Sequence, residues 1–227
     1  MKYNYLKGTD IKVSQICFGS LTMIPSQGNL SVREGAELIS YAYERGINFI
    51  DTAELYDNYA YIKAAMDIIG RENYVIATKS YAYDRKTAED SLNNALKSLN
   101  TDYIDIFLLH EQESIHTIRG HMEALDYFRE RKEAGVIRAL GISTHKIAGV
   151  SGFNQYDFLD VIHPRINYKG IGILDGTRDE MLEEINRARM REKGVYAMKF
   201  LAGGHLIPEI EKAVLKSSSN AIIGLIK

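Results

Sequence analysis

Residues 47–56 read INFIDTAELY, and this stretch decides the fold. A short apolar run that ends in a carboxylate is typical of a strand buried in a parallel sheet. The last residue of such a strand and the loop after it lie at one open end of the sheet. Asp51, at the end of the run, and Tyr56, in the loop, are therefore expected to face a common opening.

The same pattern returns at two later positions in the chain. Residues 74–79, YVIATK, and residues 104–110, IDIFLLH, are apolar segments that end in a side chain able to carry a charge or a proton. Lys79 and His110 thus join the aspartate and the tyrosine at the carboxyl ends of three consecutive expected strands.

Strands and helices alternate along the whole sequence at a spacing of roughly 25 to 35 residues, as they do in (β/α)8 barrels. The expected fold class is therefore α/β, a (β/α)8 TIM barrel preceded by a β-hairpin over residues 1–14. A doubly wound open sheet is the alternative, but its Gly-x-Gly-x-x-Gly fingerprint is missing after the first strand. The expected strands are 15–19, 47–51, 74–79, 104–110, 137–142, 159–163, 194–198 and 220–224. The expected helices are 31–46, 62–69, 88–99, 118–134, 146–156, 177–192 and one that begins near Pro208. Ser31 and Glu34 are expected to form a capping box at the start of the first helix.

Composition narrows the function classes. The 227 residues are 45% hydrophobic and carry a net charge of -2, which favours one sizeable core and gives no basic surface for a nucleic-acid partner. One domain over residues 1–227 is expected. No apolar run approaches the roughly 18 residues that span a bilayer, so a cytoplasmic protein without a membrane partner is expected. The single Cys17 allows no intramolecular disulfide.

The strand ends and several further motifs resemble the aldo-keto reductases. FIDTAELY, ATK and FLLH match the catalytic tetrad of that family, and VSQICFGSLTM, GVIRALGIST and LAGG match it elsewhere, so the resemblance covers essentially the whole chain. GISTH, IHPRINYKG and YAMKFLAGG resemble a bacterial branch. The resemblance implies an NAD(P)H-dependent oxidoreductase that reduces small aldehydes or ketones to alcohols by hydride transfer. It does not identify the substrate, whose pocket is expected to be lined by the loops 21–30, 111–117 and 168–176.

The resemblance assigns a task to each member of the tetrad. Tyr56 is expected to act as the general acid, and Lys79 to lower the pKa of the Tyr56 phenol by placing an ammonium near it. Asp51 is expected to keep Lys79 charged, and His110 to orient the substrate carbonyl or to share in the proton relay at high pH. Taken singly, each residue also has an ordinary structural interpretation, such as a turn cap for Asp51. Only the joint pattern favours catalysis.

The resemblance also implies NADP as the cofactor, with NAD as the alternative. Ser143 matches the family's contact to the nicotinamide carboxamide, and Asn167 aligns with the asparagine of its Tyr-Asn motif. Thr144 stands where the family has an asparagine after the serine, and His163 stands where it has a glutamine. The chemistry is expected to be kept, with altered cofactor geometry.

Five further residues are expected to contact the cofactor by resemblance. Gly19 and Ser20 match the loop beneath the nicotinamide, and Met198 replaces the aromatic residue that stacks on it and offers a polarizable apolar face. Gly203 and Gly204 match the loop that approaches the pyrophosphate, where glycine lets backbone N–H groups come close. An ordinary flexible turn is the alternative for the two glycines.

Other functions remain open from the sequence. A catalytically weak or inactive aldo-keto-reductase-like protein would have a binding or regulatory role. A Schiff-base lyase would use Lys79 or Lys199 as its amine. No metal site is expected, because the histidines and glutamates of residues 110–121 lack His-x-x-x-His spacing.

The sequence ends at Lys227, just past the eighth expected strand, whereas the family normally continues into a final helix. A barrel with its final helix missing would leave an apolar outer face between its last and first strands. Either a partner subunit, such as a second copy of the chain, is expected to cover that face or the protein is expected to be poorly soluble, because large apolar patches rarely stay in water.

Overall fold

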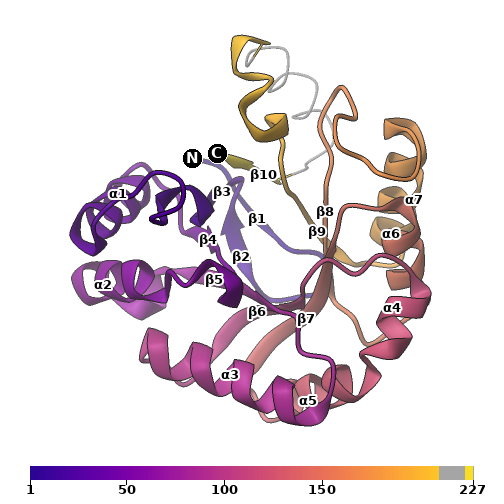
Figure 1. Cartoon of the computed structure of the whole chain (residues 1–227), viewed down its shortest axis with the longest axis horizontal. Helices are drawn as coiled ribbons and strands as arrows, with labels where there is room; N and C mark the ends of the chain where they lie inside the picture. The colour runs from indigo at the N-terminus through magenta and orange to yellow at the C-terminus, as the bar shows by residue number, and fades with distance from the viewer. Residues whose placement is uncertain (210–222, 227) are drawn as a thin grey trace.

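The computed structural model describes residues 1–209 and 223–226. Its parallel strands close into a barrel in the order β10-β3-β4-β5-β6-β7-β8-β9, which confirms the (β/α)8 fold class (Figure 1). Each strand pairs with the strand that follows it in the chain, and β10 closes the ring by pairing with β9 and β3. The strands are β3 Ile16–Gly19, β4 Phe49–Asp51, β5 Val75–Ser80, β6 Ile104–Leu109, β7 Ile137–Thr144, β8 Val161–Pro164, β9 Gly194–Ala197 and β10 Ile223–Ile226.

The expected N-terminal hairpin is present and fills the lower end of the barrel. β1 Tyr3–Tyr5 pairs antiparallel with β2 Lys12–Ser14. Buried side chains of the hairpin, among them Ile11 and Val13, pack into one apolar cluster with interior residues of the barrel strands such as Phe49. This end of the barrel is therefore closed by side chains, and a ligand site is left to the opposite end.

Helices surround the strands, as Figure 1 shows. The expected capping box at Ser31 is confirmed, because the Ser31 hydroxyl accepts a hydrogen bond from the Glu34 N–H at 3.2 Å and the Glu34 carboxylate accepts one from the Ser31 N–H at 2.8 Å. The helices are α1 Val32–Glu44, α2 Tyr59–Ile69, α3 Arg85–Leu99, α4 Ile115–Gly120, α5 Met122–Glu133, α6 Ile147–Phe153 and α7 Arg178–Met190.

The expected continuous helix over 118–134 is wrong, because two helices, α4 and α5, meet at His121. Ser114 caps the first of them, which starts three residues earlier than expected. Gly120 ends it as a poor helix former, and the His121 ring bonds to the Thr117 carbonyl at 2.6 Å.

Short 3-10 helices occupy several loops. They are η1 Leu21–Met23, η2 Glu54–Tyr56, η3 Arg71–Asn73, η4 Ala202–Gly204 and η5 Ile207–Glu209. η2 follows β4 directly and carries Tyr56. Beyond residue 209 the helix expected after Pro208 lies outside the described residues, as do residues 220–222 of the eighth expected strand.

Polar side chains replace apolar ones where the interior reaches the carboxyl ends of the strands. Asp51, Lys79, His110 and His163 are buried there, with exposed fractions of 6% or less. These buried polar groups mark the open end of the barrel as the candidate site.

In the part of the chain that the structure describes, no helix has the length and apolar character that crossing a membrane would require.

Candidate active site

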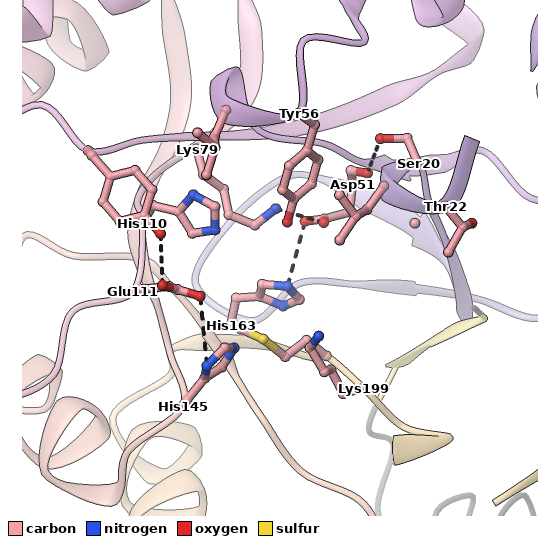
Figure 2. Close-up of a pocket in the computed structure, with 15 residues that line it drawn as sticks. Ser20, Thr22, Asp51, Tyr56, Lys79, His110, Glu111, His145, His163 and Lys199 are labelled. Atoms are coloured by element: carbon pink, nitrogen blue, oxygen red, sulfur yellow. Dashed lines mark hydrogen bonds and ion pairs between the residues drawn. The ribbon is translucent and has the colours of Figure 1, made fainter. Parts of the chain in front are cut away.

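A cavity of about 180 Å³ opens at the carboxyl ends of the strands (Figure 2). It brings together all four residues of the expected tetrad, which come from β4, η2, β5 and the residue after β6. Among the described residues it is lined by Gly19, Ser20, Leu21, Thr22, Asp51, Leu55, Tyr56, Lys79, Tyr81, His110, Glu111, His145, His163, Met198 and Lys199.

The centre of the site is a buried ion pair. The Lys79 ammonium lies 2.7 Å from Asp51 Oδ1 and donates a second hydrogen bond to the Thr52 carbonyl at 2.6 Å. Both side chains are almost fully removed from water, at 2% and 5% exposure. A buried ammonium keeps its charge only if such partners replace its hydration, so the pair fixes the position of a cation beneath the cavity.

The second oxygen of Asp51 has a partner that the sequence did not indicate. Tyr196, on β9, donates its hydroxyl to Asp51 Oδ2 at 2.9 Å. Burial raises the pKa of Tyr196 well above its ordinary value, with Asp51 adding to the effect, so the phenol stays a donor. Tyr196 therefore positions the carboxylate from across the barrel.

Tyr56 and His110 face the ion pair from the cavity side. The Lys79 Nζ atom lies 5.3 Å from the centre of the Tyr56 ring, and the Tyr56 and His110 ring centres are 5.9 Å apart in an edge-on arrangement. His110 also stacks on Tyr81, with ring centres 4.6 Å apart. The groups expected to deliver a proton and to orient a carbonyl are thus adjacent.

Both groups are neutral near pH 7. Burial, followed by the charge of Lys79, lowers the pKa of His110 to about 3. Burial, followed by the charges of Asp51 and Glu111, raises the pKa of Tyr56 above its ordinary value of 10.0. The expectation that Lys79 lowers the pKa of Tyr56 is therefore wrong, because burial and the charges of Asp51 and Glu111 determine the direction of the shift.

His163 completes the lower wall of the cavity. Its Nδ1 atom lies 2.7 Å from the Tyr196 carbonyl oxygen, which only accepts, so Nδ1 carries the proton. The ring stacks on Tyr196 at 3.9 Å, and its Nε2 atom lies 3.6 Å from Asp51 Oδ2. Burial lowers the pKa of His163 to about 4, although Asp51 opposes the change. At neutral pH Nε2 is therefore an acceptor.

Four of the expected cofactor residues line the cavity, namely Gly19, Ser20, His163 and Met198. The Ser20 hydroxyl donates to the Asp51 carbonyl at 2.9 Å and accepts from Asn58 Nδ2 at 2.9 Å, so it fixes the loop after β3. This part of the expected set is brought together with the tetrad.

The other five expected cofactor residues lie outside the described lining. Ser143 accepts a hydrogen bond from the Glu111 N–H at 2.9 Å, and Thr144 accepts one from the Lys146 N–H at 3.0 Å. Asn167 accepts from the Ile171 N–H at 3.0 Å and thereby closes its own loop. Gly203 and Gly204 have φ values of 69° and 98°, which only glycine adopts without strain.

The loops expected to line a substrate pocket do so in part. The first contributes Leu21 and Thr22, and the second contributes Glu111, whereas residues 168–176 contribute nothing to the described lining. Sequence reasoning did not single out Leu55, Tyr81, His145 or Tyr196. The one feature that these residues share in the sequence is a position near the carboxyl end of a strand. Many ordinary loop residues share it too, so it does not single them out.

His163 gives the first testable prediction, which concerns acid stability. The unfolded chain has the ordinary histidine pKa of 6.5 and the folded chain a pKa of about 4, so the unfolded state binds more protons between these values. The contribution of His163 to the free energy of unfolding is thus fully present above pH 6.5. It is lost as the pH falls to 4, by about 3 kcal/mol at about 1.36 kcal/mol per pKa unit. Urea unfolding measured from pH 7 to pH 4 checks the slope.

A matched pair of variants assigns this acid effect. His163→Gln is expected to reduce the slope by the contribution of one histidine, with His110 and His145, whose pKa values are also lowered by burial, carrying the rest. His116→Gln, at an exposed histidine, is expected to leave the slope unchanged. An unchanged slope in His163→Gln would show that other groups carry the acid sensitivity.

Comparison with known proteins identifies the family of the chain. The sequence model of the Aldo/keto reductase family matches residues 15–216. Because the match covers most of the 227 residues, the chain belongs to the aldo/keto reductase family. In the described residues, no group of three or more His, Cys, Asp or Glu side chains could hold a metal ion.

Three proteins illustrate the similarity. The aldo-keto reductase YhdN of Bacillus subtilis is 28% identical over 182 residues, which cover 74% of this chain and 54% of that protein. The crystal structure of a putative aldo-keto reductase of Pseudomonas aeruginosa has a TM-score of 0.83 at 22% identity and covers 99% of this chain and 87% of that one. An aldo-keto reductase of Bombyx mori in complex with NADP has a TM-score of 0.68 at 18% identity and covers 86% and 65%. The chain spans about half the length of the curated relatives it matches.

Proposed function

We propose that the chain is an NADPH-dependent reductase of small aldehydes and ketones in which Tyr56 is the general acid. The carrying observation is the buried Asp51–Lys79 pair, at 2.7 Å, beneath the Tyr56 ring in the cavity that also holds His110. A buried ion pair contributes little net stability after its loss of solvation. Its position under a phenol and an imidazole therefore favours a catalytic role.

The lining fits the nicotinamide end of a dinucleotide. Met198 offers a polarizable apolar face, and the Nε2 acceptor of His163 suits the N–H groups of a carboxamide. When bound, the reduced nicotinamide supplies the hydride. Ser143, Thr144, Asn167, Gly203 and Gly204 remain proposed contacts by family resemblance. The NADP complex of the Bombyx mori relative supports NADP, with NAD as the alternative.

The protein's own groups handle the proton. Because burial raises the pKa of Tyr56, the phenol remains protonated over the neutral range and holds a proton ready for transfer. As the carbonyl carbon gains a hydride, its oxygen becomes an alkoxide, a base strong enough to take that proton. The charge left on the Tyr56 oxygen is then stabilised by the nearby Lys79 ammonium. Neutral His110 can donate a hydrogen bond that orients the carbonyl.

A binding or regulatory role without turnover is the second candidate. It is favoured by the two described hydrogen bonds of Lys79, which go to Asp51 and Thr52 rather than to Tyr56. Stopped-flow mixing of the NADPH-loaded protein with a reactive aldehyde separates the two candidates. Rapid loss of the reduced-cofactor absorbance is expected for the reductase, whereas bound NADPH that stays unoxidised would favour the binding role.

Cofactor choice gives the second testable prediction. A ligand that binds only the folded state adds RT ln(1 + [L]/Kd), about 2.7 kcal/mol at a hundredfold excess over Kd. NADPH is expected to raise the thermal unfolding midpoint more than NADH at equal concentration, and His163→Ala is expected to reduce that gain. His116→Ala is the control at an exposed histidine. Equal midpoints with NADPH and with buffer would contradict a dinucleotide site.

A further inference from the structure

Glu111 lies in the cavity wall, directly after His110. Its backbone has a φ of 51°, a left-handed conformation that non-glycine residues seldom adopt. The Ser143 hydroxyl holds this conformation by accepting a hydrogen bond from the Glu111 N–H at 2.9 Å. Backbone held in this way next to a proposed catalytic group points to a functional side chain.

A hydrogen bond from Tyr81 holds the Glu111 carboxylate, and the His145 ring lies beside it. The Tyr81 hydroxyl donates to its Oε2 atom at 2.7 Å, while the Tyr81 ring stacks on His110. His145 Nδ1 lies 3.7 Å from its Oε1 atom. Figure 2 shows Glu111 between His110 and His145 on one side of the pocket. The carboxylate is therefore part of the wall next to the proposed carbonyl position.

A carboxylate in this position restricts the groups that can lie against it. It is an acceptor with about four lone-pair positions, and Tyr81 uses one of them. An apolar group would remove water from the 43% of the Glu111 side chain that is exposed and would return no hydrogen bond. A substrate carboxylate would meet a like charge. Donor groups remain as suitable occupants.

The charge of the cavity separates hydroxyl donors from ammonium donors. Lys79 and Lys199 line the same cavity as Asp51 and Glu111, so two ammonium groups already balance two carboxylates there. A cationic substrate would add a positive charge that no further carboxylate of the described lining offsets. His145 adds no charge at neutral pH, because burial lowers its pKa to about 4. A hydroxyl group can donate to Glu111 without bringing a charge into the cavity.

We propose that Glu111 is a specificity-determining residue that accepts a hydrogen bond from a substrate hydroxyl, so that the preferred substrates are small hydroxylated aldehydes and ketones. The proposal rests on the reductase function proposed above. Tyr81 acts as a positioning residue, because it holds the carboxylate in place and stacks on His110.

Glyceraldehyde and pentanal, which have equal numbers of non-hydrogen atoms, provide the test. The measured quantity is the ratio of kcat/KM for glyceraldehyde to that for pentanal. Glu111→Leu is expected to lower this ratio at least tenfold, in line with the loss of a hydrogen bond to a charged group. Tyr81→Phe, which keeps the ring, is expected to lower it by a smaller factor. A ratio in Glu111→Leu within twofold of the original would overturn the proposal.

Glu113→Leu is the matched control. Glu113 belongs to the same loop and pairs with Lys146 at 2.7 Å, but it is absent from the described lining of the cavity. Its ratio is expected to stay unchanged. Equal thermal unfolding midpoints of the two leucine variants exclude a folding defect as the cause of a difference between them.

A binding measurement keeps this inference separate from the reductase proposal. If neither aldehyde is reduced, the reductase proposal fails, and saturation-transfer NMR with glycerol and pentan-1-ol decides the role of Glu111. A glycerol signal that is lost in Glu111→Leu and kept in Glu113→Leu supports the hydroxyl site. A glycerol signal that is absent, or unaffected by Glu111→Leu, overturns it.

Discussion

Tyr56→Phe is expected to lower kcat for aldehyde reduction by about 10²- to 10⁴-fold, the usual contribution of a general acid. The change removes the hydroxyl that would protonate the substrate oxygen and keeps the ring beside Lys79 and His110. Because Tyr56 is not among the proposed cofactor contacts, Kd for NADPH is expected to stay within about twofold. Steady-state kinetics and fluorescence titration of the cofactor measure the two quantities.

Tyr83→Phe is the control for this variant. Tyr83 is an exposed tyrosine that lies outside the described lining of the cavity, so its loss of a hydroxyl is expected to leave kcat unchanged. Equal turnover by Tyr56→Phe and the unaltered protein would refute the assignment of the general acid. A matching loss of NADPH affinity would instead show that Tyr56 supports the cofactor.

The tetrad could be predicted because its information is local. Asp51, Lys79 and His110 each follow a short apolar run, and parallel strands bring their carboxyl ends to one edge. The barrel follows from the same alternation of strand and helix. The Ser31 capping box needs only four consecutive residues, and it too could be predicted.

The contacts of Asp51 could not be predicted, because they depend on distant residues. Tyr196 reaches Asp51 across 145 positions, and fifteen tyrosines offer no local signal for which one does so. The charge states of Tyr56 and His110 depend on how far burial removes water, which the sequence pattern does not measure. The contacts of Glu111 with Tyr81 and His145 could not be predicted either, because the three residues come from separate segments of the chain.

Lys79→Met is expected to lower the free energy of unfolding by about 3 to 5 kcal/mol, because it leaves the buried Asp51 carboxylate without its cation. Among the described side chains, the Tyr196 hydroxyl would then be the one hydrogen-bond donor left to the carboxylate. Lys86→Met is the control, since Lys86 and Asp90 form an exposed pair whose loss is expected to change the free energy of unfolding little. Urea unfolding at pH 7 measures both variants.

The double variant Asp51→Asn with Lys79→Met separates stability from catalysis. Asparagine brings no charge into the interior and can still accept the Tyr196 hydroxyl, so the double variant is expected to be more stable than Lys79→Met alone. Its kcat is expected to stay as low as that of Lys79→Met, because no cation stabilises the Tyr56 oxygen after proton transfer. Recovery of turnover together with stability would show that the pair serves the fold rather than the proton transfer. Stability regained without turnover would place its main role in the chemistry.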